Sequence, residues 1–213
     1  CHILMISGGF SAGDEPDGSG KFIANVLNNK EIADAIHALL DRGGLILGIC
    51  NGFQALVKSG LLPYGRLGMV TKESPTLFRN DINRHISQIV TTRVGTTNSP
   101  WLSGFAVGDL HTIAVSHGEG KFVVNEEFAK ELFANGQVAF QYVDPIDEEV
   151  TMESPYNPNG SYYAIEGIIS KNGQILGKMG HTERYEGNLF KNIIDEGLEQ
   201  PLFDNAVAYF RAE

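Results

Sequence analysis

Short apolar runs predict an α/β fold, with an open, mixed and mostly parallel sheet flanked by helices. In the first third of the chain, these runs alternate with segments of helical spacing, which is typical of parallel strands joined by helices. In the later part, strand-like segments outnumber helical ones, which favours antiparallel additions to the sheet. The chain has 213 residues, of which 42% are apolar, so it is long enough for one domain of this class.

Each expected element follows from a local pattern. Strands are placed at short apolar or β-branched runs, and helices where apolar residues recur at helical spacing and end at a glycine such as Gly43. Asn172-Gly173 is typical of a hairpin turn. In chain order, the expected strands are 3–6, 45–49, 77–80, 84–94, 101–102, 112–116, 138–143, 163–170 and 174–179, the expected helices are 21–28, 31–42, 51–58, 126–134, 188–194 and 203–210, and the segments 14–20 and 144–159 are loops.

Cys50 stands where a buried strand would turn sharply into a helix. That geometry presents a nucleophile above the edge of the sheet. Gly48 and Gly52 flank the cysteine at two positions on either side, and a side chain there would crowd the close approach of strand and helix. At a helix N-terminus, unpaired N–H groups and the dipole favour a thiolate. The Asn51 N–H would face an oxyanion formed when Cys50 attacks a substrate.

A cysteine nucleophile usually needs a base, and His181 is the best candidate among the six histidines. It follows an expected core strand, and Glu183 lies close enough to fix the tautomer of its ring. The Gly8-Gly9 turn after the first strand would supply a second oxyanion donor. His117 lies in a glycine-bearing turn and could line the cleft. The remaining four histidines, His2, His37, His85 and His111, are expected to be structural or solvated.

Each of these residues could instead have a purely structural role. A lone buried cysteine is more often a core residue than a nucleophile, and a lone His-x-Glu pair can be a surface ion pair. The flanking glycines, the preceding strand and the following helix favour a nucleophile at Cys50. Cys1 as an N-terminal nucleophile is disfavoured, because it leads directly into an expected buried strand.

Composition excludes several classes of partner and site. A net charge of −10 argues against nucleic acid or an anionic membrane surface as the main partner. No apolar run approaches the roughly 20 residues that span a bilayer. Two cysteines do not indicate a disulfide framework, so a cytoplasmic location fits. The acidic segment around Asp14, Glu15 and Asp17 lacks the ligand spacing of a calcium loop, so no metal site is expected.

Several motifs, in order along the chain, resemble those of the class I (triad) glutamine amidotransferases. Within that class they are most similar to the glutaminase domains of phosphoribosylformylglycinamidine synthases, which act in purine biosynthesis. The motifs are Gly8-Gly9-Phe10-Ser11-Ala12-Gly13-Asp14, Cys50-Asn51-Gly52, Arg79-Asn80, His117-Gly118-Glu119-Gly120, Asn157-Pro158-Asn159-Gly160-Ser161 and His181-Thr182-Glu183-Arg184.

The resemblance implies that Cys50 attacks the amide carbon of glutamine, with His181 and Glu183 completing a triad, and that ammonia leaves as a glutamyl thioester forms. It further implies an oxyanion hole at Gly9 and Asn51. The same resemblance implies that Gln54, His117 and Gly118 contact the substrate. Many members of the class have proline where Thr182 stands; since proline is not a catalytic group, little effect is expected.

The resemblance also implies a partner. Ammonia would pass to a synthase domain of the same parent protein, which uses ATP and magnesium to amidate formylglycinamide ribonucleotide. This domain itself would hold no cofactor, since no segment resembles a nucleotide-binding loop. Because the chain opens directly on an expected core strand without an initiator methionine, residues 1–213 are expected to be a single glutaminase domain, truncated at its N-terminus.

Two other functions remain open at this point. One is a stand-alone cysteine hydrolase of the γ-glutamyl hydrolase or peptidase-like type. The other is a catalytically silent docking module. Gln54 and the Asn157–Ser161 motif favour the amidotransferase over the hydrolase.

Overall fold

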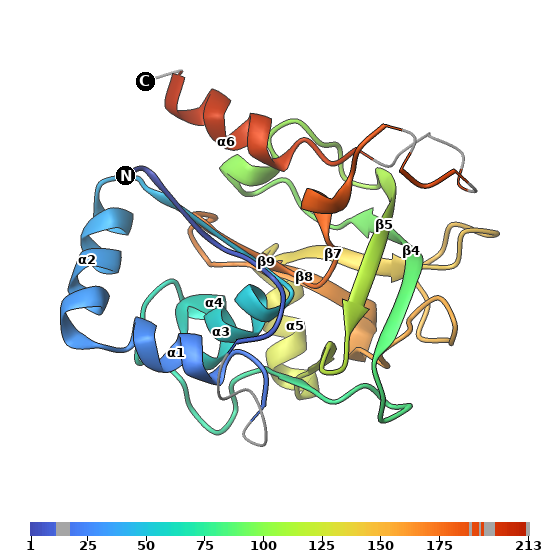
Figure 1. Ribbon diagram of the computed structural model, residues 1–213, viewed down its shortest axis with the longest axis horizontal. Helices are drawn as coiled ribbons and strands as arrows, with labels where there is room; N and C mark the ends of the chain where they lie inside the picture. Colours follow the sequence, from blue (N-terminus) through green and yellow to red (C-terminus); the bar gives the residue numbers. More distant parts are fainter. Residues whose placement is uncertain (12–17, 188, 192, 194–198, 212–213) are drawn as a thin grey trace.

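The computed structural model describes residues 1–11, 18–187, 189–191, 193 and 199–211. A seven-stranded sheet with the order β1-β2-β9-β8-β7-β4-β5 forms its centre, and β3 and β6 pair separately (Figure 1). The strands are β1 (Ile3–Ile6), β2 (Leu45–Ile49), β3 (Thr76–Phe78), β4 (Ile86–Val94), β5 (Leu110–His117), β6 (Lys121–Val123), β7 (Val138–Val143), β8 (Ile165–Ile169) and β9 (Ile175–Lys178).

The sheet is mixed, as expected, but it is not mostly parallel. Strand β2 runs parallel to β1 and to β9, whereas the pairs β9–β8, β8–β7, β7–β4 and β4–β5 are all antiparallel. The expectation of a mostly parallel sheet is therefore wrong for the described strands. The physical reason is connection length: β8 and β9 are joined by a short turn at Asn172-Gly173, which permits only antiparallel pairing.

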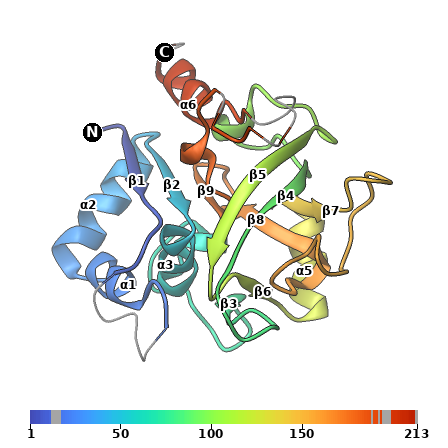
Figure 2. The same ribbon diagram turned by 45° about the vertical axis from the view of Figure 1, so that its right-hand side comes forward.

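Helices flank the sheet on both sides. Figure 1 shows α3 and α4 on one side of the β2–β9 region and α6 on the other, while Figure 2 shows α5 beside β7 and β8. The helices are α1 (Lys21–Leu27), α2 (Lys30–Asp41), α3 (Asn51–Ser59), α4 (Leu61–Tyr64), α5 (Glu126–Ala134) and α6 (Leu202–Arg211), and short 3-10 turns occur at Pro100–Leu102, Tyr162–Ala164 and Thr182–Arg184.

Local sequence explains where helices begin. The side chain of Asn29 accepts a hydrogen bond from the Glu31 N–H at the start of α2 (3.1 Å), and Asn125 accepts one from Phe128 at the start of α5 (2.8 Å). Such caps satisfy N–H groups that have no partner within the helix.

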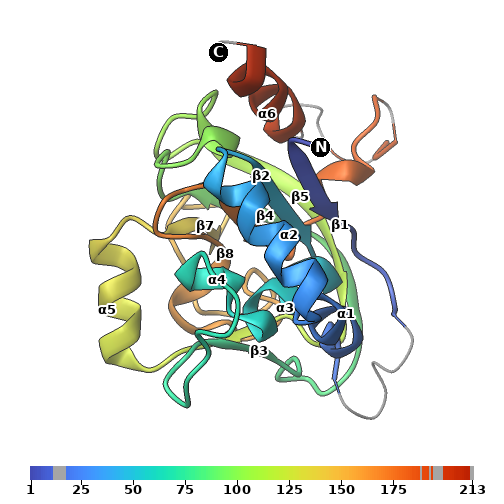
Figure 3. The ribbon, with the colours of Figure 1, turned by 90° about the vertical axis from the view of Figure 1, so that its left-hand side faces the viewer.

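Figure 3 shows α2 and α1 lying in sequence along the β1 side of the molecule.

The apolar run of β2 is explained by its position. All five of its residues are buried, between β1 and β9 in the sheet and with α3 packed nearby. A parallel strand covered on both faces needs no polar alternation.

Three local expectations are wrong or fall partly outside the described residues, and one short strand was not expected. Residues 101–102 are not a strand: Ser99 accepts a hydrogen bond from the Trp101 N–H (3.2 Å) and starts a 3-10 turn. The short strand β6 was missed, because three residues are too few to show alternation. The helix expected over 188–194 falls partly outside the described residues, as does the loop expected over 14–20, and the described part of 188–194 is not helical.

The glycines at the strand–helix turn have the packing role that the sequence predicts. A β-carbon on Gly52 would lie 2.0 Å from the Ile6 carbonyl oxygen. One on Gly48 would lie 2.5 Å from a methyl carbon of Leu56 and 2.8 Å from the Gly52 carbonyl carbon. Helix α3 therefore lies directly against β1 and β2 with no room for side chains between them.

We predict that Gly52→Ala strongly destabilises the protein, because the backbone of β1 has to move to admit the methyl group. A loss of about 3 kcal/mol in the free energy of unfolding is expected, at the upper end of what overpacking costs. Urea unfolding measures it. Gly187→Ala is the control, since a β-carbon there meets no atom of the described residues within 4 Å, its chain neighbours aside. Equal stability of the two variants would contradict the prediction.

Candidate active site

Cys50 occupies the strained turn between β2 and α3. Its backbone has φ 53° and ψ −108°, and its side chain is buried. Positive φ in a residue with a β-carbon costs free energy and persists only where the surrounding structure enforces it. Here the packing of Gly48 and Gly52 enforces it, so the sulfur lies at the N-terminus of α3.

His181 reaches Cys50 because their strands are parallel neighbours. Ile49 at the end of β2 pairs with Lys178 at the end of β9, and the Cys50 N–H donates to the Lys178 carbonyl (2.8 Å). Both side chains therefore emerge at the same edge of the sheet. A β-carbon on Gly8 would lie 2.8 Å from Cε1 of His181 and 3.1 Å from Cβ of Cys50, so both residues border the same small space.

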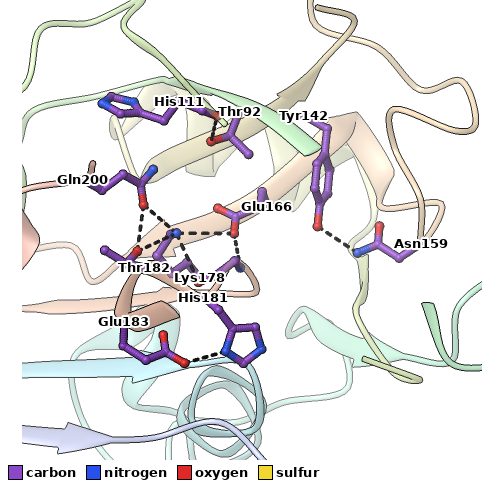
Figure 4. A network of polar contacts seen from close by, with 11 residues as sticks. Thr92, His111, Tyr142, Asn159, Glu166, Lys178, His181, Thr182, Glu183 and Gln200 are labelled. Carbon is purple, nitrogen blue, oxygen red and sulfur yellow. Dashed lines mark hydrogen bonds and ion pairs between the residues drawn. The ribbon is translucent and has the colours of Figure 1, made fainter. Parts of the chain in front are cut away.

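Glu183 orients the histidine ring. Nδ1 of His181 lies 2.6 Å from Oε1 of Glu183 (Figure 4). Burial by itself raises the pKa of Glu183, but the hydrogen bond and charge of His181 outweigh it and lower the pKa. The carboxylate is thus an acceptor and Nδ1 carries the proton. Nε2 on the other side of the ring is buried and has no hydrogen-bond partner among the described residues.

The surroundings favour a protonated His181. Burial lowers its pKa, but interactions with Cys50 and then with Glu183 raise it, with a net result of about 9. Such a value is characteristic of an imidazolium that is hydrogen-bonded to a carboxylate. The geometry therefore brings a nucleophile, a proton donor and an orienting group together at one edge of the sheet.

A small cavity of about 70 Å³ opens beside Cys50. Four more of the residues singled out in the sequence line it, namely Gly9, Gln54, His117 and Gly118. The cavity therefore gathers residues from widely separated parts of the chain around the sulfur atom.

His117 is held rigidly and kept neutral. Its Nδ1 lies 3.2 Å from Oδ1 of Asn80, and the Asn80 amide donates back to the His117 carbonyl (2.8 Å). Burial is the main cause that lowers its pKa to about 4, with the charges of His85 and His181 adding to it. A neutral ring that donates from Nδ1 presents Nε2 as an acceptor, and that atom is buried without a partner among the described residues.

The segment 157–161 supports the turn that carries His117. The Asn159 side chain donates to the Gly120 carbonyl (2.8 Å), and the Ser161 hydroxyl reaches the same oxygen (3.3 Å). Gln54 holds the turn from the other side, since its amide donates to the Glu119 carbonyl. This motif is therefore a scaffold for the cavity wall.

The two expected oxyanion donors lie next to Cys50. Gly9 borders the cavity with φ 103°, a conformation that favours glycine. Asn51 is the first residue of α3, and its side-chain amide donates to the Ser11 hydroxyl (3.1 Å). The N–H groups of a first helical turn lack partners within the helix. Their role as an oxyanion hole stays a prediction.

Sequence reasoning missed several residues that line the cavity. His85, expected to be structural or solvated, borders it and shares a hydrogen bond with the Ser116 hydroxyl (3.0 Å). The Ser116 carbonyl lies 3.6 Å from the Cys50 sulfur. Phe10 and Arg184 also line the cavity. Both belong to recognised motifs, so a signal existed for them, whereas His85 carries no local signal.

The other histidines are remote from the cavity. Nε2 of His37 accepts a hydrogen bond from the Leu67 N–H (3.2 Å), and the His111 ring packs edge-on against Phe105 (5.1 Å). His2 contacts the ring of Phe210 (5.2 Å). These three residues have structural contacts, as expected.

Within the described part of the chain, no group of three or more histidine, cysteine or acidic residues is placed to hold a metal ion. Asp14, Glu15 and Asp17 lie outside that part. No helix among the described residues is both long and apolar enough to cross a membrane.

Comparisons with known proteins agree with this geometry. The family model for CobB/CobQ-like glutamine amidotransferase domains matches residues 1–210. The phosphoribosylformylglycinamidine synthase subunit PurQ of Methanococcus maripaludis strain C5 is 37% identical, over 98% of this chain and 81% of the relative. The same subunit of Gloeobacter violaceus is 34% identical over 86% of this chain and 71% of its own length.

Among solved structures, PurLQS from Thermotoga maritima is similar, with a TM-score of 0.70 and 27% identity, over 98% of this chain and 80% of the other. The resemblance to glutamine amidotransferases seen in the sequence is thereby confirmed. With a strained cysteine, a paired histidine and glutamate, and a family match along nearly its whole length, the chain belongs to the CobB/CobQ-like glutamine amidotransferase domains.

Proposed function

We propose that this chain is a glutaminase that releases ammonia from glutamine for the synthesis of phosphoribosylformylglycinamidine. The observation that carries the proposal is the alignment of Cys50, His181 and Glu183 at the ends of two parallel strands. The reaction that consumes the ammonia is inferred from the name of the relatives, which are PurQ subunits of phosphoribosylformylglycinamidine synthase.

The proposed reaction has two halves. The Cys50 thiolate attacks the amide carbon of glutamine, and the carbonyl electron pair moves to oxygen. The N–H groups of Gly9 and Asn51 stabilise that oxyanion. When the oxyanion collapses, the C–N bond breaks and His181 gives its Nε2 proton to the departing nitrogen. Ammonia leaves, and a thioester between Cys50 and the glutamyl group remains.

Hydrolysis of the thioester restores the enzyme. Neutral His181 takes a proton from water, the resulting hydroxide attacks the thioester carbon, and the C–S bond breaks to release glutamate and the thiolate. Glu183 keeps the proton on Nδ1 throughout, so that Nε2 alternates between acid and base.

We assign substrate contacts to the cavity wall. His117 is neutral near pH 7 and presents Nε2 as an acceptor, which suits an N–H group of the substrate. Gln54 and Gly118 border the same space and would contact the amino-acid end of glutamine.

The partner in this proposal is a synthase that holds ATP and magnesium and amidates formylglycinamide ribonucleotide. The relatives are named as synthase subunits, which favours a synthase on a separate chain over one fused to this chain. The reaction is assigned to the cytoplasm, where a catalytic thiol stays reduced. No cofactor is assigned to this domain itself. The hydrolase and docking-module alternatives have no observation in their favour.

Labelling with an electrophilic glutamine analogue, followed by peptide mass spectrometry, tests the proposed nucleophile. Cys50 is expected to be modified, with protection by excess glutamine. Cys50→Ala is expected to abolish labelling while changing the free energy of unfolding by only about 1 kcal/mol. Cys1→Ala is the control, because Cys1 is exposed and is the other free cysteine. Labelling of Cys1 instead of Cys50 would refute the proposal.

The pH dependence of ammonia release tests the role of His181 as the general acid. Its pKa of about 9 in the free protein means that the imidazolium is lost as the pH rises through that value, so kcat/KM for ammonia release is expected to fall above about pH 9. The Glu183 carboxylate helps to raise that pKa. Glu183→Gln is therefore expected to move the alkaline limb to lower pH. An unmoved limb in a folded variant would show that Glu183 does not control this proton.

A further inference from the structure

A buried charged cluster lies directly behind the catalytic histidine. It consists of Lys178, Glu166, Thr182 and Gln200, and we call it the buried lysine cluster (Figure 4). Lys178 and Glu166 have fully buried side chains. Charges are rarely placed in an interior unless they are paired and hydrogen-bonded, so this arrangement needs an explanation. The triad mechanism uses none of these four residues.

The contacts of Lys178 match an ammonium group. Its Nζ lies 3.2 Å from the Gly180 carbonyl, 3.1 Å from the Thr182 hydroxyl and 2.8 Å from Oε1 of Gln200. An ammonium has three hydrogens to donate and accepts none, so three acceptors satisfy it completely. The Thr182 hydroxyl donates a hydrogen bond to Oε1 of Gln200 (2.8 Å), so the lone pairs of the hydroxyl oxygen can accept from Lys178.

Glu166 provides the opposite charge and a second contact to the same turn. Its Oε1 lies 3.8 Å from Nζ of Lys178 and accepts a hydrogen bond from the Gly180 N–H. Burial lowers the pKa of Lys178, while the charges of Glu166 and Glu183 oppose that shift. The pair is therefore connected electrostatically to the triad as well as to its own backbone contacts.

Together these contacts hold the chain on both sides of His181. Gly180 is held at its N–H by Glu166 and at its carbonyl by Lys178, and Thr182 is held at its hydroxyl. The His181 N–H donates to the Ala114 carbonyl of β5 (2.8 Å). The main chain thus leaves β9 in one defined direction, and that direction aims the imidazole at Cys50.

We propose that Lys178, with Glu166 as its counter-ion, is a positioning residue that fixes the Gly180–Thr182 turn and so aligns His181 with Cys50. This inference rests on the proposed function, because it assigns a partner to the proposed general acid. The Thr182 hydroxyl, anchored by the buried ammonium of Lys178, restricts the turn.

The test is the double variant Lys178→Met/Glu166→Gln. It replaces both charges by neutral groups of similar shape and leaves an amide oxygen to accept from the Gly180 N–H, so no buried charge is left unpaired. The matched control is Lys130→Met/Glu126→Gln, which removes an exposed ion pair on α5 (2.6 Å) remote from the cavity. Cys50 labelling by the electrophilic glutamine analogue is measured for the whole 213-residue chain.

The double variant is expected to reduce the limiting rate of labelling at least tenfold, with less than a twofold change in the half-saturating concentration of analogue. The parent chain and the control are expected to share the faster limiting rate. Loss of the binding pocket would raise the half-saturating concentration as well, so a fall in rate alone identifies a positioning role.

Labelling of a folded double variant at the limiting rate of the parent would overturn the proposal. If that variant fails to fold, Thr182→Val and Thr182→Ser decide: valine keeps the shape and loses the hydroxyl, whereas serine keeps the hydroxyl. Slow labelling of the valine variant with recovery in the serine variant supports the proposal, and equal rates overturn it. Absence of labelling in the parent chain would instead overturn the proposed function.

Discussion

Parallel pairing of β2 with β1 and β9 is the constraint on which the rest of the site depends. Three strands that run in one direction end at one edge of the sheet. Cys50, His181 and the glycine turn after β1 therefore meet although they lie far apart in the chain. A shift in that register would separate the sulfur from the imidazole, whatever the local structure around each.

Close packing turns this meeting into a catalytic geometry. The positions of Gly8, Gly48 and Gly52 admit no β-carbon without contact at or below about 3 Å with a neighbour. Their absence of side chains lets α3 lie against the strands and forces Cys50 into a positive φ. The strain at the nucleophile is thus balanced by the burial of the apolar core around β2.

Polar groups buried around the site each have a defined supporting role. Asn80, Asn159 and Ser161 hold the turn that carries His117. The buried lysine cluster holds the turn that carries His181. Burying such groups costs free energy unless their hydrogen bonds are satisfied. In return, the two histidines have fixed rings and different charge states: His117 is neutral and His181 is protonated.

The sequence by itself determined the chemistry. The strand–cysteine–helix turn, the flanking glycines and the His181-Thr182-Glu183 motif are local patterns, and local patterns can be read from neighbouring residues. Only the tertiary structure decided the order of the strands in the sheet, the approach of His85 to the cavity and the buried contacts of Lys178. These depend on which distant segments pair and pack, and no spacing within one segment encodes the position of another.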